Sequence, residues 1–286
     1  MEILNITVEN ANEMKISDYL KSRVGFSSAL ITKVKFGGVS LNGEVVTMRA
    51  AVKDGDCIQI HLPTERSEGI QSIEHPLDIV YEDEHLLVIN KPKDMPTHPS
   101  RGNHLTTLAN ATVAYLGENF VFRAINRLDR GTAGIVIIAK NAFAAAKLGR
   151  AMKERKIHKK YIALVKGIPS LTSARISAPI ARIEEGNIKR CVREDGKEAI
   201  TDYTVLKTTE SGDSICEIEL HTGRTHQIRV HMAHIGHPLV GDFLYGEDGE
   251  DGYYLTCSEI RLPHPITNTD MTFRINGDLV ANYAPE

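Results

Sequence analysis

Residues 123–138 read RAINRLDRGTAGIVII, which joins a charged turn to an apolar strand. Asp129 stands between Arg127 and Arg130, and two glycines follow it. The apolar run 134–138 predicts a strand that is buried on both faces inside a sheet. A carboxylate beside arginines is expected to stay ionised at neutral pH, as a nucleophile requires. Taken alone, however, such a turn is more typical of a surface salt bridge.

A second chemically rich stretch, residues 220–238, reads LHTGRTHQIRVHMAHIGHP. Its histidines raise the question of a metal site, but His226 and His231 are five positions apart. That spacing places them on opposite faces of a strand or roughly 140° apart on a helix. No acidic ligand lies among them, so no metal site is predicted. Arg224 and Arg229 fit better as partners of a carboxylate or a phosphate, which guanidinium groups bind in bidentate fashion.

The composition is that of a globular protein, with 286 residues, of which 42% are hydrophobic. It argues against disorder, collagen and coiled coil, and the length favours two domains. The net charge of −3 hides an uneven distribution. Residues 140–166 carry nine bases and one acid, a net of +8, whereas residues 241–286 carry two bases and nine acids, a net of −7. A local basic surface for a phosphate-rich partner is therefore compatible with the overall charge.

The four cysteines are widely spaced and form no CxxC pair, which favours a reducing compartment over a disulfide framework. The first 15 residues lack a basic stretch followed by an apolar run, so no signal peptide is expected. No apolar run approaches the roughly 20 residues that span a bilayer. We therefore expect a cytoplasmic protein.

Patterns along the chain predict a small unit over residues 1–62, a linker over 63–74 and a larger mixed domain over 75–286. In the first unit, apolar spacing predicts helices near 14–21 and 27–34, and Asn42-Gly43 predicts the turn of a hairpin. A strand is expected after the turn at Asp54-Gly55. In the larger domain, strands are expected at 86–89 and 134–138, and helices at 106–116 and 142–154.

The first unit is rich in bases, a pattern that more often marks a solvated helical face. The order of its elements is more telling: two helices, then Gly37-Gly38, an Asn-Gly hairpin and a late Gly-Asp strand. This arrangement resembles the S-four-like RNA-binding module, named after a small-subunit ribosomal protein. The resemblance implies that Lys33, Lys35 and Arg49 face RNA phosphates.

Four ordered blocks stand out in the larger domain: residues 81–92 with His98-Pro99, residues 126–130 with Thr132 and Gly134, residues 159–167, and residues 222–231 followed by 236–242 and 244–246. Together these blocks resemble the pseudouridine synthases of the RluA/RluD type, and His264-Pro265 fits as well. The resemblance implies an α+β protein, in which a small α/β RNA-binding module precedes a mixed, mainly antiparallel β-sheet catalytic domain. It also implies isomerisation of uridine within RNA, from a nitrogen-linked to a carbon-linked base.

Site residues follow from the same resemblance. Asp129 matches the essential aspartate, either as a covalent nucleophile or as a base that gives a glycal intermediate. Tyr161 matches the tyrosine that stacks on the uracil and helps to remove its carbon-5 proton. Arg229 matches the basic partner of the aspartate, with Ile228 as an apolar wall beside it. Arg127 matches the arginine that enters the RNA stack when the target nucleotide is flipped out.

The partner implied is RNA, with ribosomal RNA favoured by the appended basic module and transfer RNA as the alternative. Because the reaction has no redox step and no external group donor, no cofactor is expected, and we expect a monomer. A non-catalytic RNA-binding or ribosome-assembly protein is the main rival. A glycoside hydrolase would need a second carboxylate facing the same bond, and none accompanies Asp129 in these blocks.

Four positions depart from the family pattern. The family has His where this chain has Asn126, an acid at Gly131, Ser at Ala133 and Gly at Asp94. None of these removes the proposed catalytic set. Asn126 and Gly131 flank the aspartate, and they therefore bear on how the RNA target fits.

Overall fold

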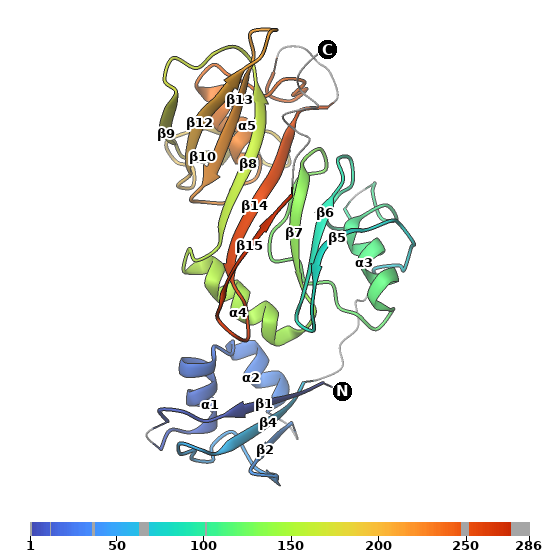
Figure 1. The fold of residues 1–286 in the computed structure, drawn as a ribbon, viewed down its shortest axis with the longest axis vertical. Helices are drawn as coiled ribbons and strands as arrows, with labels where there is room; N and C mark the ends of the chain where they lie inside the picture. Colours follow the sequence, from blue (N-terminus) through green and yellow to red (C-terminus); the bar gives the residue numbers. More distant parts are fainter. Residues whose placement is uncertain are drawn as a thin grey trace.

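The computed structural model describes residues 2–11, 13–35, 38–62, 69–100, 102–246 and 252–275. A small N-terminal unit and a larger sheet follow one another along the longest axis of the molecule, with a helix between them (Figure 1). The helices are α1 (Ile16–Tyr19), the π-helical turn η1 (Leu20–Val24), α2 (Ser28–Val34), α3 (Leu108–Leu116), α4 (Ala142–Lys153) and α5 (Gln227–His234). The strands are β1 (Glu2–Thr7), β2 (Val39–Leu41), β3 (Glu44–Val45), β4 (Cys57–Leu62), β5 (Asp78–Glu82), β6 (Leu86–Lys91), β7 (Ala133–Ala139), β8 (His158–Val165), β9 (Ser173–Ser177), β10 (Ile180–Arg182), β11 (Arg190–Val192), β12 (Ile200–Thr208), β13 (Ser214–Leu220), β14 (Leu255–Pro263) and β15 (Asp270–Arg274).

The N-terminal unit is a four-stranded antiparallel sheet, ordered β1-β4-β2-β3, that packs against α1, η1 and α2. The hairpin at Asn42-Gly43 is confirmed, since their φ values of 52° and 90° are those of a two-residue type I′ turn. The helix predicted near residues 14–21 begins at Ile16 and passes into the π-helical turn, which ends at Gly25 with φ 93°. Strand β1 forms one edge of this sheet beside β4, and no local pattern predicted it.

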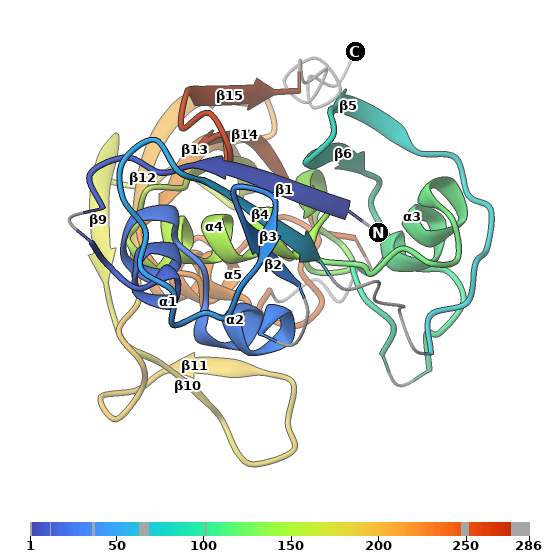
Figure 2. The ribbon, with the colours of Figure 1, turned by 90° about the horizontal axis from the view of Figure 1, so that it is seen from below.

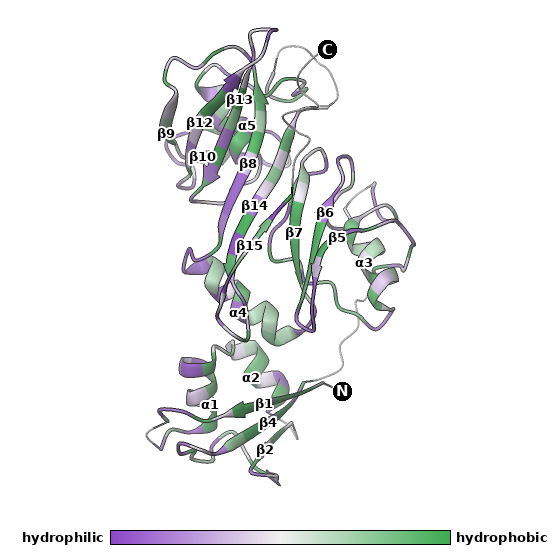
Figure 3. Ribbon diagram, viewed as in Figure 1, coloured by the Kyte–Doolittle hydropathy of each residue, from purple (hydrophilic) through white to green (hydrophobic). Residues whose placement is uncertain are grey.

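The larger sheet has the order β5-β6-β7-β14-β8-β13-β12-β9, with β15 paired to β14. Among the described strands, β7 and β14 run parallel and the other paired neighbours run antiparallel, which confirms the α+β class with a mainly antiparallel sheet. Strand β7 is buried from Gly134 onward, as its apolar run predicts, and most of its length is coloured as hydrophobic (Figure 3). Gly134 has φ +111°, and a Cβ there would lie 2.3 Å from the Cys257 carbonyl oxygen, so the parallel pairing requires glycine. Strands β10 and β11 form a separate two-stranded ribbon that projects from the main body (Figure 2).

Helix α4 joins the two parts. Phe143 on α4 belongs to the core of the N-terminal unit, where its ring centroid lies 5.1 Å from that of Phe26. Leu148 and Ala151 of the same helix pack into the core of the larger sheet. The expected linker at 63–74 lies partly outside the described residues, because 63–68 are not described. No helix in the described part of the chain is both long and apolar enough to cross a membrane.

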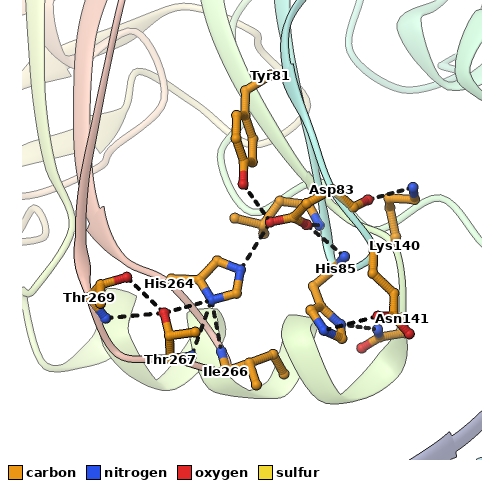
Figure 4. Close-up of polar contacts among 11 residues, drawn as sticks. Tyr81, Asp83, His85, Lys140, Asn141, His264, Ile266, Thr267 and Thr269 are labelled. Carbon is orange, nitrogen blue, oxygen red and sulfur yellow. Dashed lines mark hydrogen bonds and ion pairs between the residues drawn. The ribbon is translucent and has the colours of Figure 1, made fainter.

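A polar cluster around Asp83 ties three loops together at the end of the larger sheet that faces the N-terminal unit (Figure 4). The Asp83 carboxylate accepts hydrogen bonds from the backbone N–H groups of His85 and Leu86, both at 2.7 Å, and from the Tyr81 hydroxyl at 2.8 Å. The Nε2 atom of His264, in the turn before β15, lies 3.0 Å from Oδ2 of the same carboxylate. Its Nδ1 accepts from backbone N–H groups of its own turn, so Nε2 carries the proton given to Asp83.

The cluster also fixes the start of α4. The Asn141 amide nitrogen lies 3.1 Å from His85 Nδ1, and its oxygen accepts from the backbone N–H of Ala144 at 2.8 Å as the N-cap of the helix. Ile266, in the same turn as His264, packs against the core of the N-terminal unit. The cluster therefore positions the surface on which that unit rests.

Replacing Asp83 by asparagine is expected to destabilise the fold by about 1–2 kcal/mol at pH 7, because hydrogen bonds to a charged acceptor are lost. Burial alone would raise the pKa of Asp83, but the hydrogen bonds from His85, Leu86, Tyr81 and His264 bring it below its usual value. The stabilisation is therefore present above about pH 4 and is lost as the pH falls through the folded-state pKa. Urea unfolding at pH 7 and at stepwise lower pH measures the difference between the two proteins, which should shrink on acidification.

The matched control is Glu210→Gln, which changes an exposed carboxylate in the turn between β12 and β13. It should leave the free energy of unfolding unchanged within about 0.5 kcal/mol. A cost for Asp83→Asn that stays constant from pH 7 down to pH 2 would contradict the role assigned to its charge.

Candidate active site

The turn that carries Asp129 is held against β7 by a side chain in place of a strand partner. Asn126 is buried, its amide nitrogen donates to the Ile135 carbonyl at 2.9 Å, and its oxygen accepts from the Ile137 N–H at 2.9 Å. The amide thus satisfies one donor and one acceptor of a strand that would otherwise be unpaired there. The departure from the family pattern at Asn126 is therefore compatible with a firmly placed aspartate.

Two further contacts define the turn itself. The Thr97 hydroxyl, which is buried, donates to the Leu128 carbonyl at 2.9 Å and accepts from the Leu128 N–H at 3.2 Å. The Thr132 N–H donates to the Asp129 carbonyl at 3.0 Å, closing the turn. The Asp129 carboxylate projects from this rigid backbone with 37% of its side chain exposed, so it is accessible to a ligand.

Lys91 lies fully buried beneath the turn and was not predicted as a site residue. Its ammonium group donates to the carbonyls of Pro92 at 2.8 Å, Met95 at 2.7 Å and Arg130 at 3.4 Å. Burial lowers its pKa to about 8, while the charge of Asp129 acts in the opposite direction. Lys91 therefore fastens the loop after β6 to the Asp129 turn.

Arg229 is the point at which the structure differs from expectation. Its guanidinium makes a bidentate ion pair with Asp242, with Nε to Oδ2 at 2.7 Å and Nη2 to Oδ1 at 2.6 Å, and both side chains are buried. The Tyr253 ring lies against it, 4.2 Å from the guanidinium carbon to the ring centroid. The charge of Asp129 still contributes to raising the pKa of Arg229, so the two groups are close enough to interact electrostatically. The direct partner is nevertheless Asp242, whose role the sequence patterns did not reveal.

Tyr161 lies on β8, between β13 and β14, and only 5% of it is exposed. Burial raises its pKa well above the usual value, and the neighbouring Cys257 and the charge of Asp129 act in the same direction. The phenol is thus a neutral group near neutral pH. It can offer an aromatic surface and a hydroxyl hydrogen to a ligand beside Asp129.

Two further predicted residues, Arg224 and Ile228, lie in the loop before α5 and in the first turn of that helix. Ile228 is buried in the main core, and the buried Gln227 ties the loop to β12 through the Ile200 carbonyl at 3.0 Å. The Arg224 Nε donates to the Glu198 carbonyl at 2.8 Å, and this bond ties the loop to the segment before β12. The Nε2 atom of His226 lies 3.9 Å from the Asp129 carboxylate. The sequence pattern raised this histidine only as a metal ligand.

Arg127 is exposed at the rim of the turn, and its charge joins burial in lowering the pKa of His98. Lys33, Lys35 and Arg49 are exposed as well, on the N-terminal unit and not at the Asp129 turn. The structure therefore separates the predicted residues into a group around Asp129 and a distant basic group on the N-terminal unit (Figure 1).

Two of the departures from the family pattern have local explanations. Asp94 adopts φ +65°, the left-handed region in which glycine is the usual residue and which aspartate tolerates. A Cβ at Gly131 would lie 3.0 Å from the Tyr253 ring. In this chain the space beside the aspartate is thus occupied by a tyrosine.

The histidines of the α5 region have separate partners. His231 is buried, with Nδ1 2.9 Å from the Thr201 hydroxyl and Nε2 2.9 Å from the Ala178 carbonyl. Across the described ranges, no group of three or more His, Cys, Asp or Glu side chains has an arrangement that could hold a metal ion.

Comparison with known proteins identifies a family, close relatives in sequence and a similar solved structure. Residues 85–234 match the RNA pseudouridylate synthase family model. The uncharacterized RNA pseudouridine synthase YjbO of Bacillus subtilis is 38% identical over 268 residues, covering 91% of this chain and 94% of the relative. The ribosomal large subunit pseudouridine synthase D of Pasteurella multocida is 40% identical over 288 residues, 94% of this chain and 84% of the relative. The solved structure of human RNA pseudouridylate synthase domain containing 1 superposes with a TM-score of 0.63 at 31% identity, covering 74% of this chain and 89% of that one.

The fold and the site define an enzyme built on a mixed, mainly antiparallel sheet, in which the accessible carboxylate of Asp129 lies near the buried Lys91 and Arg229. The chain belongs to the RNA pseudouridylate synthase family, of the RluA/RluD type, and is an RNA pseudouridine synthase, an isomerase that acts on RNA.

Proposed function

We propose that this enzyme isomerises specific uridines of large-subunit ribosomal RNA and that Asp129 is its catalytic carboxylate. One observation carries the proposal for the residue. The Asp129 carboxylate is 37% exposed and lies 3.9 Å from His226 Nε2, and its charge also acts on the pKa of Lys91, Tyr161, Arg229 and Tyr253, so groups from four segments of the chain lie around it. The choice of RNA rests on the relatives whose names specify the ribosomal large subunit.

In the proposed mechanism, the glycosidic bond of a flipped-out uridine lies against Asp129. Flipping costs about a few kcal/mol, which stacking and charge contacts must offset. The exposed Arg127 is suited to fill the vacated place in the RNA stack, since its guanidinium is planar. Asp129 then acts either as a nucleophile toward the sugar or base, or as a base toward a sugar proton.

Tyr161 acts in this scheme as a neutral phenol. Its raised pKa makes a free phenolate a poor starting state for removal of the carbon-5 proton. The ring supplies a surface on which the uracil stacks, worth roughly 1–3 kcal/mol. Ile228 and the buried Arg229–Asp242 pair support the wall beside it.

We also propose that residues 1–62 form an S-four-like RNA-binding domain and that residues 75–286 form the catalytic domain. The phosphate contacts of the RNA-binding domain are Lys33 and Lys35 at the end of α2, together with the exposed Arg49. Helix α4 packs against this unit through Phe143 and carries further bases, Arg150 and Lys153. Bases on both sides of the junction favour one RNA strand that contacts the module and α4 together.

Substitution of Lys33 and Lys35 together by glutamine is expected to weaken RNA binding about 10-fold or more near 0.1 M salt and to reduce the magnitude of the salt slope by about 2. The maximal rate at saturating RNA should change less than about twofold. Titration of labelled RNA at several salt concentrations measures the affinity and the salt slope, and tritium release at saturating RNA measures the maximal rate.

Point substitutions are preferable to deletion of the module, because deletion would expose Phe143. Lys207→Gln, an exposed position on β12, is the control and should bind like the parent protein. An unchanged dissociation constant for the double variant at every salt concentration would refute the role of α2 in binding RNA.

The choice of RNA is tested by incubating the purified full chain with ribosomal RNA or transfer RNA that carries tritium at uracil carbon 5. Isomerisation removes the hydrogen at that carbon and releases tritium to water. The proposal requires release from large-subunit ribosomal RNA, whereas release confined to transfer RNA would replace the substrate.

A further inference from the structure

His226 occupies an unusual position at the active site. It immediately precedes α5 with φ 57° and ψ 20°, a left-handed conformation that costs free energy in residues other than glycine. Its side chain is 13% exposed, and it lies between Asp129 and Tyr245. Backbone strain of this kind persists only where surrounding contacts hold the residue in place, and it is common at active sites.

A chain of hydrogen bonds defines which ring nitrogen carries the proton. The backbone N–H of Arg190, at the start of β11, donates to the Tyr245 hydroxyl oxygen at 2.9 Å. The hydroxyl lies 2.8 Å from His226 Nδ1, which is the acceptor that the described residues offer to its hydrogen. Burial lowers the pKa of His226, and Arg229 and Arg190 act in the same direction while Asp129 opposes them. The imidazole is therefore neutral, with Nδ1 as acceptor and the proton on Nε2.

That Nε2 faces the Asp129 carboxylate, 3.9 Å from Oδ2. The separation is slightly longer than a hydrogen bond, as catalytic contacts often are before substrate binds. The nearby cations have other partners: Arg229 donates from Nε and Nη2 to Asp242, and Lys91 donates to backbone carbonyls. Of the described Lys, Arg and His side chains, His226 is the one that lies within 4.0 Å of the Asp129 carboxylate.

We propose that His226 is a positioning residue, whose Nε2–H binds one oxygen of Asp129 and leaves the other directed at the flipped uridine. This inference rests on the proposed catalytic role of Asp129. His226 forms and breaks no covalent bond in this role. Through Tyr245, the tautomer of His226 depends on the placement of β11, so the projecting ribbon of β10 and β11 is coupled to the catalytic carboxylate.

The test compares two substitutions of His226 in the full chain by single-turnover tritium release at saturating RNA. Phenylalanine keeps a planar ring but has no donor, and it should lower the rate about 10- to 100-fold, as expected for a misaligned reacting group. Glutamine retains an N–H of similar reach and should recover most of that loss. The RNA dissociation constant should stay within about twofold of the parent in both, since neither contact lies on the phosphate surface.

Tyr245→Phe removes only the hydroxyl that fixes the tautomer. Tyr245→Phe should lower the single-turnover rate by several-fold. In a protein that already carries His226→Phe it should lower the rate little further, because the two side chains act through the same chain of hydrogen bonds. Thermal unfolding of each variant identifies any that fails to fold, and Tyr245→Phe then still tests the chain of contacts.

Two outcomes would overturn the inference: a His226→Phe rate within twofold of the parent, or equal losses for phenylalanine and glutamine at unchanged RNA affinity. Asp129→Asn, measured in parallel, separates this inference from the proposal on which it rests. If Asp129→Asn retains the parent rate, the catalytic role of Asp129 fails. If Asp129→Asn is inactive and His226→Phe is fully active, only the role of His226 fails.

Discussion

Replacing Asp129 by asparagine is expected to abolish tritium release from RNA labelled at uracil carbon 5, with a rate loss of at least about 10³-fold. The amide has nearly the same shape as the carboxylate, but it is neither a nucleophile nor a base toward the ribose. The backbone turn should persist, because Asn126, Thr97 and Lys91 hold it through contacts that do not involve the Asp129 carboxylate. RNA binding should therefore remain while chemistry stops.

Asp78→Asn provides the matched control. It makes the same chemical change on β5, at an exposed carboxylate that accepts a hydrogen bond from Asn90. This variant should release tritium at the parent rate. Retention of more than about a tenth of the parent rate by Asp129→Asn would remove Asp129 from the chemical step.

The second large effect is expected on stability. Asp242→Asn leaves the buried guanidinium of Arg229 without its counter-charge, because the Asp242 side chain is 0% exposed and that of Arg229 only 4%. Breaking one partner of a buried ion pair costs about 3–5 kcal/mol in the free energy of unfolding. Urea unfolding followed by far-ultraviolet circular dichroism measures the loss.

Arg175 and Asp202 supply a control with similar geometry and different burial. They also form a bidentate pair, at 2.7 and 2.8 Å, but the two side chains are 60% and 33% exposed. Asp202→Asn should therefore cost no more than about 1 kcal/mol. Similar costs for the buried and the exposed pair would contradict the importance given to burial.

Local patterns predicted the elements that depend on local physics. The apolar run in β7, the Asn42-Gly43 turn and the amphipathic pattern of α4 all carry signals that act over a few residues. Helix α3 begins at Leu108, two residues after the expected start, because the Thr107 side chain caps it there. The strand order of the larger sheet could not be predicted from local patterns, because β14 pairs with β7 and β8, which are far away in sequence.

In the candidate site as well, some residues could be predicted from the sequence and others could not. The ordered motifs predict Asp129, Tyr161 and Arg229 as site residues, and in the structure the charge of Asp129 acts on the pKa of both of the others. The pairing of Arg229 with Asp242 depends on how the turn after α5 folds back, which no residue spacing reveals. The buried Lys91 was likewise missed, because its partners are backbone carbonyls and these carry no sequence signal.

The most direct test of the central claim is to treat unmodified large-subunit ribosomal RNA with the full chain, without added cofactor, and to locate pseudouridine by specific chemical labelling and sequencing. The parent protein should convert one or a few defined uridines, and Asp129→Asn should convert none of them. Conversion of the same uridines by Asp129→Asn at the parent rate, or no conversion by the parent, would contradict the account.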